Sequence, residues 1–308
     1  MRMIPLAEKK ILVTGGHGFL GGAVIRTLLA RGVPMASLVL PRSADCDLRV
    51  KADCERAVAG VDIVIHTAAI SGNGAFHASH PAEILYDNAL MALQLMDAAQ
   101  RAGVKKFVGI GSATEYPESV AFPLKEGDLL SGPPAAGHAA YSAAKRLMLS
   151  LGDAYRAQYG LSAVHLMPAN MYGAGEARDT YVIPALFKKF MVAQKAGAES
   201  VVMFGTGREA REFLYVDDAA EAVVLAAEKY EGTEPVNLGT GIETSIADLA
   251  GHITALTGFA GKVVWGGETS GEAIRRVFDV SRAEREFGFR AKTGIADGLR
   301  KTFESLTF

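Results

Sequence analysis

Apolar runs and segments with helical periodicity alternate through the first half of this chain. Short runs rich in β-branched residues lie at 10–16, 37–41, 61–69, 105–112 and 162–170. Segments with apolar residues at helical spacing lie at 19–32, 81–103 and 139–160. Strands that are apolar throughout and separated by helices indicate a parallel sheet covered on both faces. The pattern therefore predicts a doubly wound α/β domain over residues 1–168.

The regular alternation ends after Asn170. A helical pattern at 182–194 and a glycine-rich turn at 204–212 lead to the apolar run 213–218, a further helix and the run 235–241. No internal repeat or low-complexity linker separates these elements from the first half. We therefore expect residues 169–308 to form mainly a smaller α/β substrate-binding domain. Segments near 211–240 are expected to return to the first domain.

Composition excludes several classes of partner. The 308 residues carry 32 Lys+Arg against 34 Asp+Glu, so no basic excess indicates nucleic acid. No apolar stretch approaches the roughly 20 residues that a bilayer span needs, so no membrane partner is expected. Cys46 and Cys54 are the two cysteines, and their spacing matches no metal or redox motif. We expect free thiols, a cytoplasmic location and no metal site.

The segment "TGGHGFLG" is the first chemical motif. It follows a strand and opens a helix, and Gly16, Gly18 and Gly21 fit the G-x-G-x-x-G spacing, while Gly15, Gly18 and Gly21 fit a three-residue spacing. Either arrangement lets the backbone approach a pyrophosphate at the helix N-terminus. Arg42, at the end of the second strand, can pair with a 2′-phosphate. The motif therefore predicts a Rossmann-like dinucleotide site that favours NADP(H), with NAD(H) possible.

The segments "GSATEYP" and "YSAAK" are the second motif. Tyr141 and Lys145 are four residues apart on a helix, so both side chains project from one face. A nearby ammonium lowers the pKa of a phenol, which lets the pair move a proton at a carbonyl or alcohol. Ser112 ends the preceding strand, at the sheet edge where ligands of such folds bind. We expect these three residues to be catalytic.

These motifs, together with "PANMYG" and "REFLYVDD", resemble the extended short-chain dehydrogenase/reductases of the NAD-dependent epimerase/dehydratase family, which act on nucleotide sugars. The resemblance covers Lys10 to about Leu306. The second half is most similar to the GDP-L-fucose synthases, through "YVIPALFKKFMVAQKAG" and "FGTGREAREFLYVDDAA". It implies a catalytic Ser112, Tyr141 and Lys145, and a homodimer through the helices of residues 81–103 and 139–160.

The resemblance also implies binding residues. Those expected at the cofactor are Gly15, Gly18, Phe19, Leu20, Gly21, Arg42, Asp47, Leu48, Ala68, Ala69, Lys145 and Pro168. Those expected at the nucleotide sugar are Thr114, Asn170, Tyr181, Val182, Lys189, Phe204, Arg211 and Arg275.

The chain departs from the fucose synthases at the two acid/base positions. A cysteine and a histidine there are replaced by Thr114 and Tyr181, which are poor proton shuttles near neutral pH. The adjacent Asp and Glu of the dehydratases are replaced by Ala113 and Thr114, and Glu115 is expected to be an ordinary loop carboxylate. These departures predict reduction without epimerisation at C3 or C5.

The resulting hypothesis is NADPH-dependent reduction of the 4-keto group of a nucleotide-linked 4-keto-6-deoxysugar. The alternatives are a nucleotide-sugar 4-epimerase with tightly bound NAD, an epimerase/reductase of the GDP-L-fucose synthase type, and a non-catalytic module that senses the cofactor. The sequence does not specify the sugar, the nucleotide base or the configuration at C4.

Overall fold

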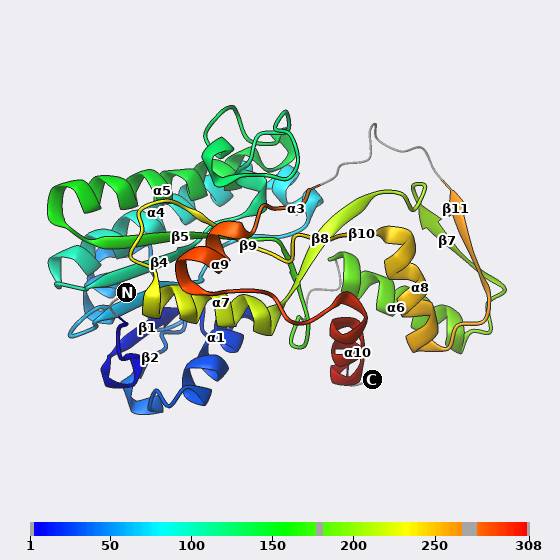
Figure 1. Cartoon of the computed structure of the whole chain (residues 1–308), viewed down its shortest axis with the longest axis horizontal. Coiled ribbons are helices and arrows are strands. Elements are labelled where there is room, and N and C mark those ends of the chain that lie inside the picture. Colours follow the sequence, from blue (N-terminus) through cyan, green and yellow to red (C-terminus); the bar gives the residue numbers. More distant parts are fainter. Residues whose placement is uncertain (1–2, 177–180, 267–275, 307–308) are drawn as a thin grey trace.

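The computed structural model describes residues 3–176, 181–266 and 276–306, and its larger part is built around a six-stranded sheet (Figure 1). The strands of this sheet are β1 (Ile11–Thr14), β2 (Leu38–Val39), β3 (Ile63–His66), β4 (Lys106–Ile110), β5 (Ser162–Pro168) and β9 (Val236–Leu238). Their order is β2-β1-β3-β4-β5-β9, and every neighbouring pair is parallel. The predicted doubly wound parallel sheet is confirmed.

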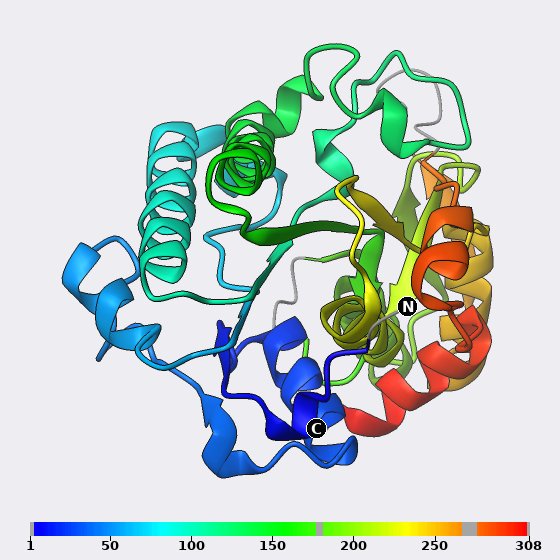
Figure 2. The same cartoon turned by 60° about the vertical axis from the view of Figure 1, so that its left-hand side comes forward.

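Helices cover both faces of this sheet because its strands are apolar on both sides. The covering helices are α1 (Phe19–Ala30), α2 (Lys51–Ala57), α4 (Pro81–Arg101), α5 (Ala139–Tyr159) and α7 (Val216–Lys229). Figure 2 shows α4 beside α5 on one face and α1 beside α7 on the other. Successive strand residues alternate between the two cores: Ile11 and Val13 pack with α1 and α7, and Leu12 packs with α4.

The strand order reverses at β1, which pairs with β2 on one side and with β3 on the other. In open parallel sheets, such a switch point leaves a crevice outside the carboxyl ends of the strands, where ligands bind. Thr14 and His66 end these two strands side by side, and the Thr14 hydroxyl lies 2.8 Å from His66 Nδ1. The chain that leaves them, at Gly15 and Thr67, therefore frames the crevice.

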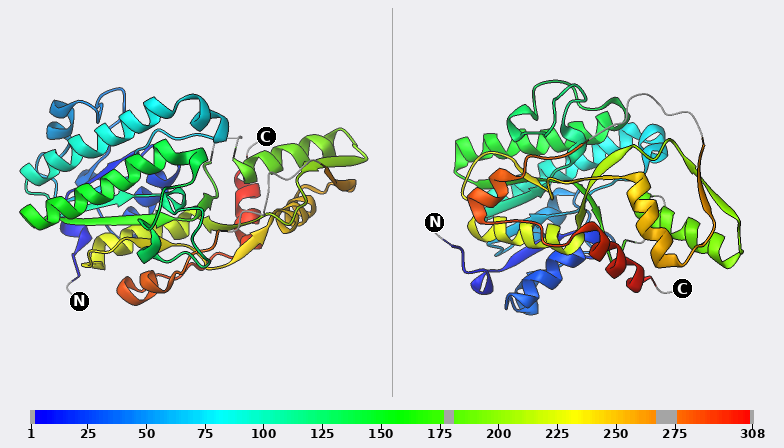
Figure 3. Two further views of the ribbon diagram at one scale, coloured as in Figure 1. Left: turned by 90° about the horizontal axis from the view of Figure 1, so that it is seen from above. Right: turned by 45° about the vertical axis from the view of Figure 1, so that its right-hand side comes forward.

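A smaller unit extends beyond the carboxyl end of the large sheet (Figure 3). Its strands are β6 (Asn170–Tyr172), β7 (Ser200–Phe204), β8 (Ala210–Tyr215), β10 (Glu243–Ser245) and β11 (Lys262–Gly266). Its helices are α6 (Val182–Lys195), α8 (Ile246–Thr257) and α10 (Ile295–Ser305). These elements enclose a core of their own, in which Phe187 and Phe190 of α6 face Leu249 and Ile253 of α8.

Two later segments return to the large sheet. α7 and β9 fall within the region predicted to return, and β9 completes the sheet beside β5. The segment after residue 275 also returns: α9 (Ser281–Phe287) packs against α7 and β9. Phe278 and Phe287 join the core of the larger unit. This last return was not predicted, since only the region near 211–240 was expected to rejoin the first domain.

Buried polar side chains fasten these returning segments together. The Glu212 carboxylate, at the centre of β8, accepts the backbone N–H groups of Phe278 at 2.7 Å and Gly241 at 2.8 Å. Asn237, fully buried in β9, donates to the carbonyls of Leu124 and Asp279 and accepts the Tyr116 hydroxyl. The bond from Phe278 joins β8 of the smaller unit to the segment that returns to the large sheet. The Asn237 bonds hold that segment and the loop at Leu124 against β9.

Across residues 3–176, 181–266 and 276–306, no helix combines the length and apolar composition needed to cross a membrane.

Candidate active site

The glycine turn after β1 brings two backbone segments close together. Gly15 has a φ of +68°, and a Cβ atom there would lie 2.8 Å from the Ala68 nitrogen. A Cβ atom on Gly21 would lie 2.1 Å from the Gly15 carbonyl oxygen. α1 begins directly after the turn, at Phe19, so the first N–H groups of the helix point into the crevice. This backbone geometry fits a pyrophosphate at the positive end of α1.

A side cleft of about 660 Å³ continues from the glycine turn past the end of β2. Arg42 lines it, together with Asp47, Leu48, Ala68 and Ala69. The Asp47 carboxylate is held by Arg49, with Nε–Oδ1 at 2.9 Å and Nη2–Oδ2 at 2.8 Å. These bonds lower the pKa of Asp47. Because Arg49 compensates the charge of Asp47, the cleft suits the additional phosphate of NADP(H).

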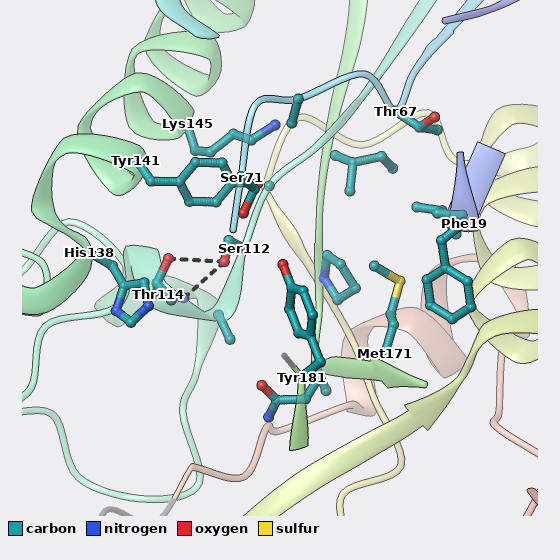
Figure 4. A pocket seen from close by; sticks show the side chains of 18 of the residues that line it. Phe19, Thr67, Ser71, Ser112, Thr114, His138, Tyr141, Lys145, Met171 and Tyr181 are labelled. Atoms are coloured by element: carbon teal, nitrogen blue, oxygen red, sulfur yellow. Dashed lines mark hydrogen bonds between the residues drawn. The ribbon is translucent and has the colours of Figure 1, made fainter. Parts of the chain in front are cut away.

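The main cleft, of about 920 Å³, contains the predicted catalytic serine (Figure 4). Ser112 caps the short 3-10 helix η3 (Ala113–Glu115), and its Oγ accepts the Thr114 N–H at 3.2 Å. The Thr114 hydroxyl lies 3.0 Å from Ser112 Oγ and 3.0 Å from Ser142 Oγ. The Ser112 hydroxyl therefore belongs to a network with the amide and hydroxyl of Thr114, and its own proton can go to the Thr114 oxygen or to a group in the cleft. Ser112 is thus both a helix cap and a cleft residue.

Tyr141 and Lys145 reach the same cleft from the first two turns of α5 (Figure 4). The Lys145 ammonium lies 5.5 Å from the centre of the Tyr141 ring. Only 4% of Lys145 is exposed, and this burial lowers its pKa to about 8. A cation so close to the phenol favours the tyrosinate. The structure therefore brings the three predicted catalytic residues together.

Two arginines line the cleft away from the glycine turn. Arg211 comes from β8, and Arg276 comes from the returning segment and donates to the Ala113 carbonyl at 3.3 Å. Burial lowers the pKa of both, and the charge of Arg276 lowers that of Arg211 further. Two guanidinium groups held close enough to repel each other indicate a site for an anion such as a diphosphate.

The predicted binding residues divide into three groups. Those that line the main cleft or its side cleft are Gly15, Gly18, Phe19, Leu20, Gly21, Arg42, Asp47, Leu48, Ala68, Ala69, Thr114, Lys145, Pro168, Asn170, Tyr181 and Arg211. Val182, Lys189 and Phe204 are described but lie outside both linings, and Lys189 Nζ donates to the Val202 carbonyl. Arg275 lies outside the described residues.

The sequence prediction did not include His77, His138 and Arg276, which line the cleft, or the buried Ser142, whose hydroxyl bonds Thr114. His138 begins α5 three residues before Tyr141 and lies beside Thr114 (Figure 4). The His77 ring packs against the rings of both His138 and Tyr141. The sequence prediction named Arg275, which lies outside the described residues, and the neighbouring Arg276 lines the cleft.

The expectation for Glu115 was wrong. Its side chain is fully buried beneath Ser112 rather than exposed on a loop. The carboxylate accepts the Ser112 N–H at 2.6 Å and lies 3.0 Å from Nε2 of the buried His165. The sequence places this histidine 50 positions later, on a different strand, so its proximity was not visible.

Within the described part of the chain, no three metal-ligating side chains from histidine, cysteine, aspartate and glutamate gather in one place.

Comparison with known proteins identifies similar sequences and structures. The model of the NAD dependent epimerase/dehydratase family matches residues 11–239. The probable GDP-L-fucose synthase 1 of Oryza sativa subsp. japonica is 34% identical, over 97% of this chain and 93% of the relative. The GDP-L-fucose synthase of Escherichia coli (strain K12) is 30% identical, over 97% of each chain. Both similarities extend through the smaller unit.

A solved structure with similar architecture is the GDP-mannoheptose C4 reductase of Campylobacter jejuni with NADP bound. It superposes with a TM-score of 0.87 at 28% identity, over 97% of this chain and 98% of that chain. The similarity therefore includes both the sheet and the smaller unit.

The glycine turn yields a prediction with a matched control. Gly21→Ala places a Cβ atom 2.1 Å from the Gly15 carbonyl, so the turn must open. We expect NADPH binding, followed by its fluorescence, to weaken at least about tenfold. Gly22→Ala is the control, because its Cβ atom would be 3.7 Å from the nearest atom, the Gly16 carbonyl oxygen. Equal affinity of the two variants would contradict the assignment of the turn.

Proposed function

The chain belongs to the NAD dependent epimerase/dehydratase family, and on this premise we propose that it reduces the 4-keto group of a nucleotide-linked 4-keto-6-deoxysugar with NADPH, without epimerising C3 or C5. The observation that carries the proposal is the convergence of Ser112, Tyr141 and Lys145 beside the glycine turn in one cleft. Similarity to GDP-L-fucose synthases and to a GDP-sugar C4 reductase with NADP bound supports the same chemistry.

Ser112, Tyr141 and Lys145 have different roles in the reduction. When bound, NADPH supplies the hydride. The Ser112 hydroxyl donates to the substrate carbonyl oxygen and orients it. The Tyr141 phenol gives that oxygen its proton as the carbonyl carbon becomes an alcohol carbon. The Lys145 cation, held near the ring, makes Tyr141 a stronger acid and is placed to bind the nicotinamide ribose.

The far end of the cleft suits the nucleotide part of the substrate. Arg211 and Arg276 would bind the diphosphate, since guanidinium groups make paired hydrogen bonds with phosphate oxygens. Asn170 and Tyr181 line the same cleft, where they would contact the sugar. The diphosphate would then hold the sugar with its ketone toward Tyr141.

The absence of epimerisation is supported by the bonds of Thr114 and Tyr181. The Thr114 hydroxyl is engaged between Ser112 and Ser142. The Tyr181 hydroxyl donates to the Gly72 carbonyl at 3.4 Å. A threonine hydroxyl held in a hydroxyl network and a phenol that donates to a backbone carbonyl are poorly placed to take a proton next to a ketone.

An epimerase/reductase is the second candidate, because His138 lies beside Thr114 in the cleft (Figure 4). Burial and the neighbouring His77 lower the pKa of His138. The imidazole is therefore neutral at neutral pH and can accept a proton. His138 does not occupy either of the two acid/base positions of the fucose synthases, which are those of Thr114 and Tyr181. The heavy-water experiment below tests whether it acts as the base.

The proposal includes a homodimer and a cytoplasmic location. Leu85 and Leu93 of α4 and Leu147 of α5 are exposed apolar side chains on two adjacent helices (Figure 2). Such a surface suits a second copy of the chain. The two free cysteines suit a reducing compartment.

The function is tested by following NADPH oxidation with a nucleotide-linked 4-keto-6-deoxysugar. We expect turnover by the unmodified enzyme and a fall in kcat of at least about 100-fold in Tyr141→Phe, which removes the proton donor. NADPH binding should be unchanged, because the ring remains. Turnover that survives the substitution would reject Tyr141 as the acid. An enzyme that carries bound NAD⁺ and consumes no NADPH would be the 4-epimerase instead.

Proton exchange distinguishes the two candidates. In heavy water with NADPH, we expect a product without enzyme-dependent deuterium at C3 or C5, measured by mass spectrometry and NMR. Deuterium at either carbon would contradict the reductase-only proposal. His138→Asn and Tyr181→Phe then identify the base, since only the variant that lacks the responsible side chain loses the exchange while retaining NADPH oxidation.

A further inference from the structure

Two buried ionisable side chains that the proposed reaction does not use lie directly behind the catalytic residues. Glu115 is fully buried and His165 is 5% exposed. The Glu115 carboxylate lies 3.0 Å from His165 Nε2 through Oε2, and accepts the Ser112 N–H at 2.6 Å through Oε1. Burying a carboxylate has a large desolvation cost, which packing alone does not offset. The pair therefore calls for an explanation beyond packing.

The backbone around the pair leaves room for it. β4 and β5 are neighbours in register, with Gly109 opposite His165, and the Gly111 N–H donates to the Leu166 carbonyl at 2.7 Å. A Cβ atom on Gly111 would lie 2.4 Å from His165 Nε2 and 2.5 Å from Glu115 Oε1. A residue larger than glycine at position 111 would therefore separate the carboxylate from the imidazole.

We propose that Glu115, oriented by His165, is a positioning residue: its carboxylate fixes the backbone of Ser112 and supplies the negative charge that keeps the buried Lys145 a cation beside Tyr141. The inference rests on the proposed reduction for its kinetic consequences. Its structural basis is independent of the substrate.

The geometric half of the proposal follows from the capping box. The Ser112 side chain bonds the Thr114 N–H, while the Glu115 carboxylate bonds the Ser112 N–H. These reciprocal bonds fix the main chain of Ser112 in an extended conformation at the end of β4. The direction of Ser112 Oγ into the cleft therefore depends on the carboxylate behind it.

The electrostatic half follows from the packing of α5 on η3 and from the burial of Lys145. Ser142 and Arg146, which flank Lys145 along α5, donate to the carbonyls of Thr114 and Glu115. Desolvation lowers the pKa of Lys145 to about 8, and the charge of Glu115 acts in the opposite direction. Without that charge, the ammonium would lose its proton at a lower pH. The reduction needs a protonated Tyr141 and a charged Lys145. As the pH rises, kcat therefore falls when the first of these two groups loses its proton.

Other charged and titratable groups surround this region. Arg146 on α5 donates to the Glu115 carbonyl at 2.9 Å, and Arg276 donates to the Ala113 carbonyl. Burial lowers the pKa of His66 on β3 to about 3, so it is neutral, and burial raises the pKa of Tyr116. His165 faces the carboxylate from β5. Of these groups, Glu115 is the one whose charge opposes the effect of burial on the pKa of Lys145.

The test compares kcat against pH for three variants. Glu115→Gln removes the charge, so the fall of kcat at alkaline pH (the alkaline limb) should begin about one pH unit lower. We also expect kcat at pH 7 to fall about tenfold. Glu115→Asp keeps the charge on a shorter side chain, so it should lower kcat and leave the limb in place. His165→Gln also keeps the carboxylate, so its limb should not move to lower pH.

Glu126→Gln is the matched control. Glu126 is a second buried carboxylate, and it accepts the Asn237 N–H at 3.1 Å rather than a bond from the catalytic serine. We expect its alkaline limb to match that of the unmodified enzyme. An alkaline limb that stays in place in Glu115→Gln, or that moves equally in Glu126→Gln, would overturn the proposal.

A second readout separates this proposal from the proposed function. The ionisation of Tyr141 is measured without substrate, as the tyrosinate absorbance that Tyr141→Phe removes from each variant. Glu115→Gln should move this titration to lower pH, because removing a negative charge lowers both pKa values of the pair. If the titration moves but the enzyme reduces no substrate, the proposed reductase function is wrong and the proposed role of Glu115 stands. If it does not move, the role of Glu115 is wrong.

Discussion

The buried ammonium group of Lys145 is the interaction on which the rest of the candidate site depends. Only 4% of this residue is exposed, yet the chemistry requires its charge next to Tyr141. A cation with little water around it needs compensation from the protein. The Glu115 carboxylate provides it from behind the serine turn, and Gly111 leaves the space that this carboxylate occupies. The catalytic residues and the buried pair thus form one electrostatic unit.

A second constraint is that β1 and β3 end side by side at the point where the strand order reverses. Gly15 and Ala68 approach there so closely that a side chain on the glycine would strike the backbone. The smaller unit is joined to the segment that returns to the large sheet by the bond from the Phe278 N–H to Glu212. Arg211, the residue before Glu212 on β8, lines the cleft. A ligand with a diphosphate at one end and a ketone at the other suits that arrangement.

Much of this could be predicted from the sequence, because the informative signals are local. The parallel sheet followed from apolar runs, and the Tyr141–Lys145 pair followed from spacing along one helix. The expected preference for NADP(H) began from Arg42, and NADP is bound in a solved structure of similar architecture. Glu115 was misjudged because its partner His165 lies on another strand. The side chains of His77 and His138 likewise meet only when α3 (Gly74–Ser79) packs beside the start of α5.

The central claim is that hydride reaches the carbonyl carbon C4 of the sugar while Tyr141 protonates the oxygen. The most direct measurement uses NADPH that carries deuterium at both positions of nicotinamide carbon 4, with the 4-keto substrate in ordinary water. The account predicts a product with one deuterium atom, located at sugar C4 by NMR. Deuterium at another sugar carbon, or a reduced product without deuterium, would contradict it.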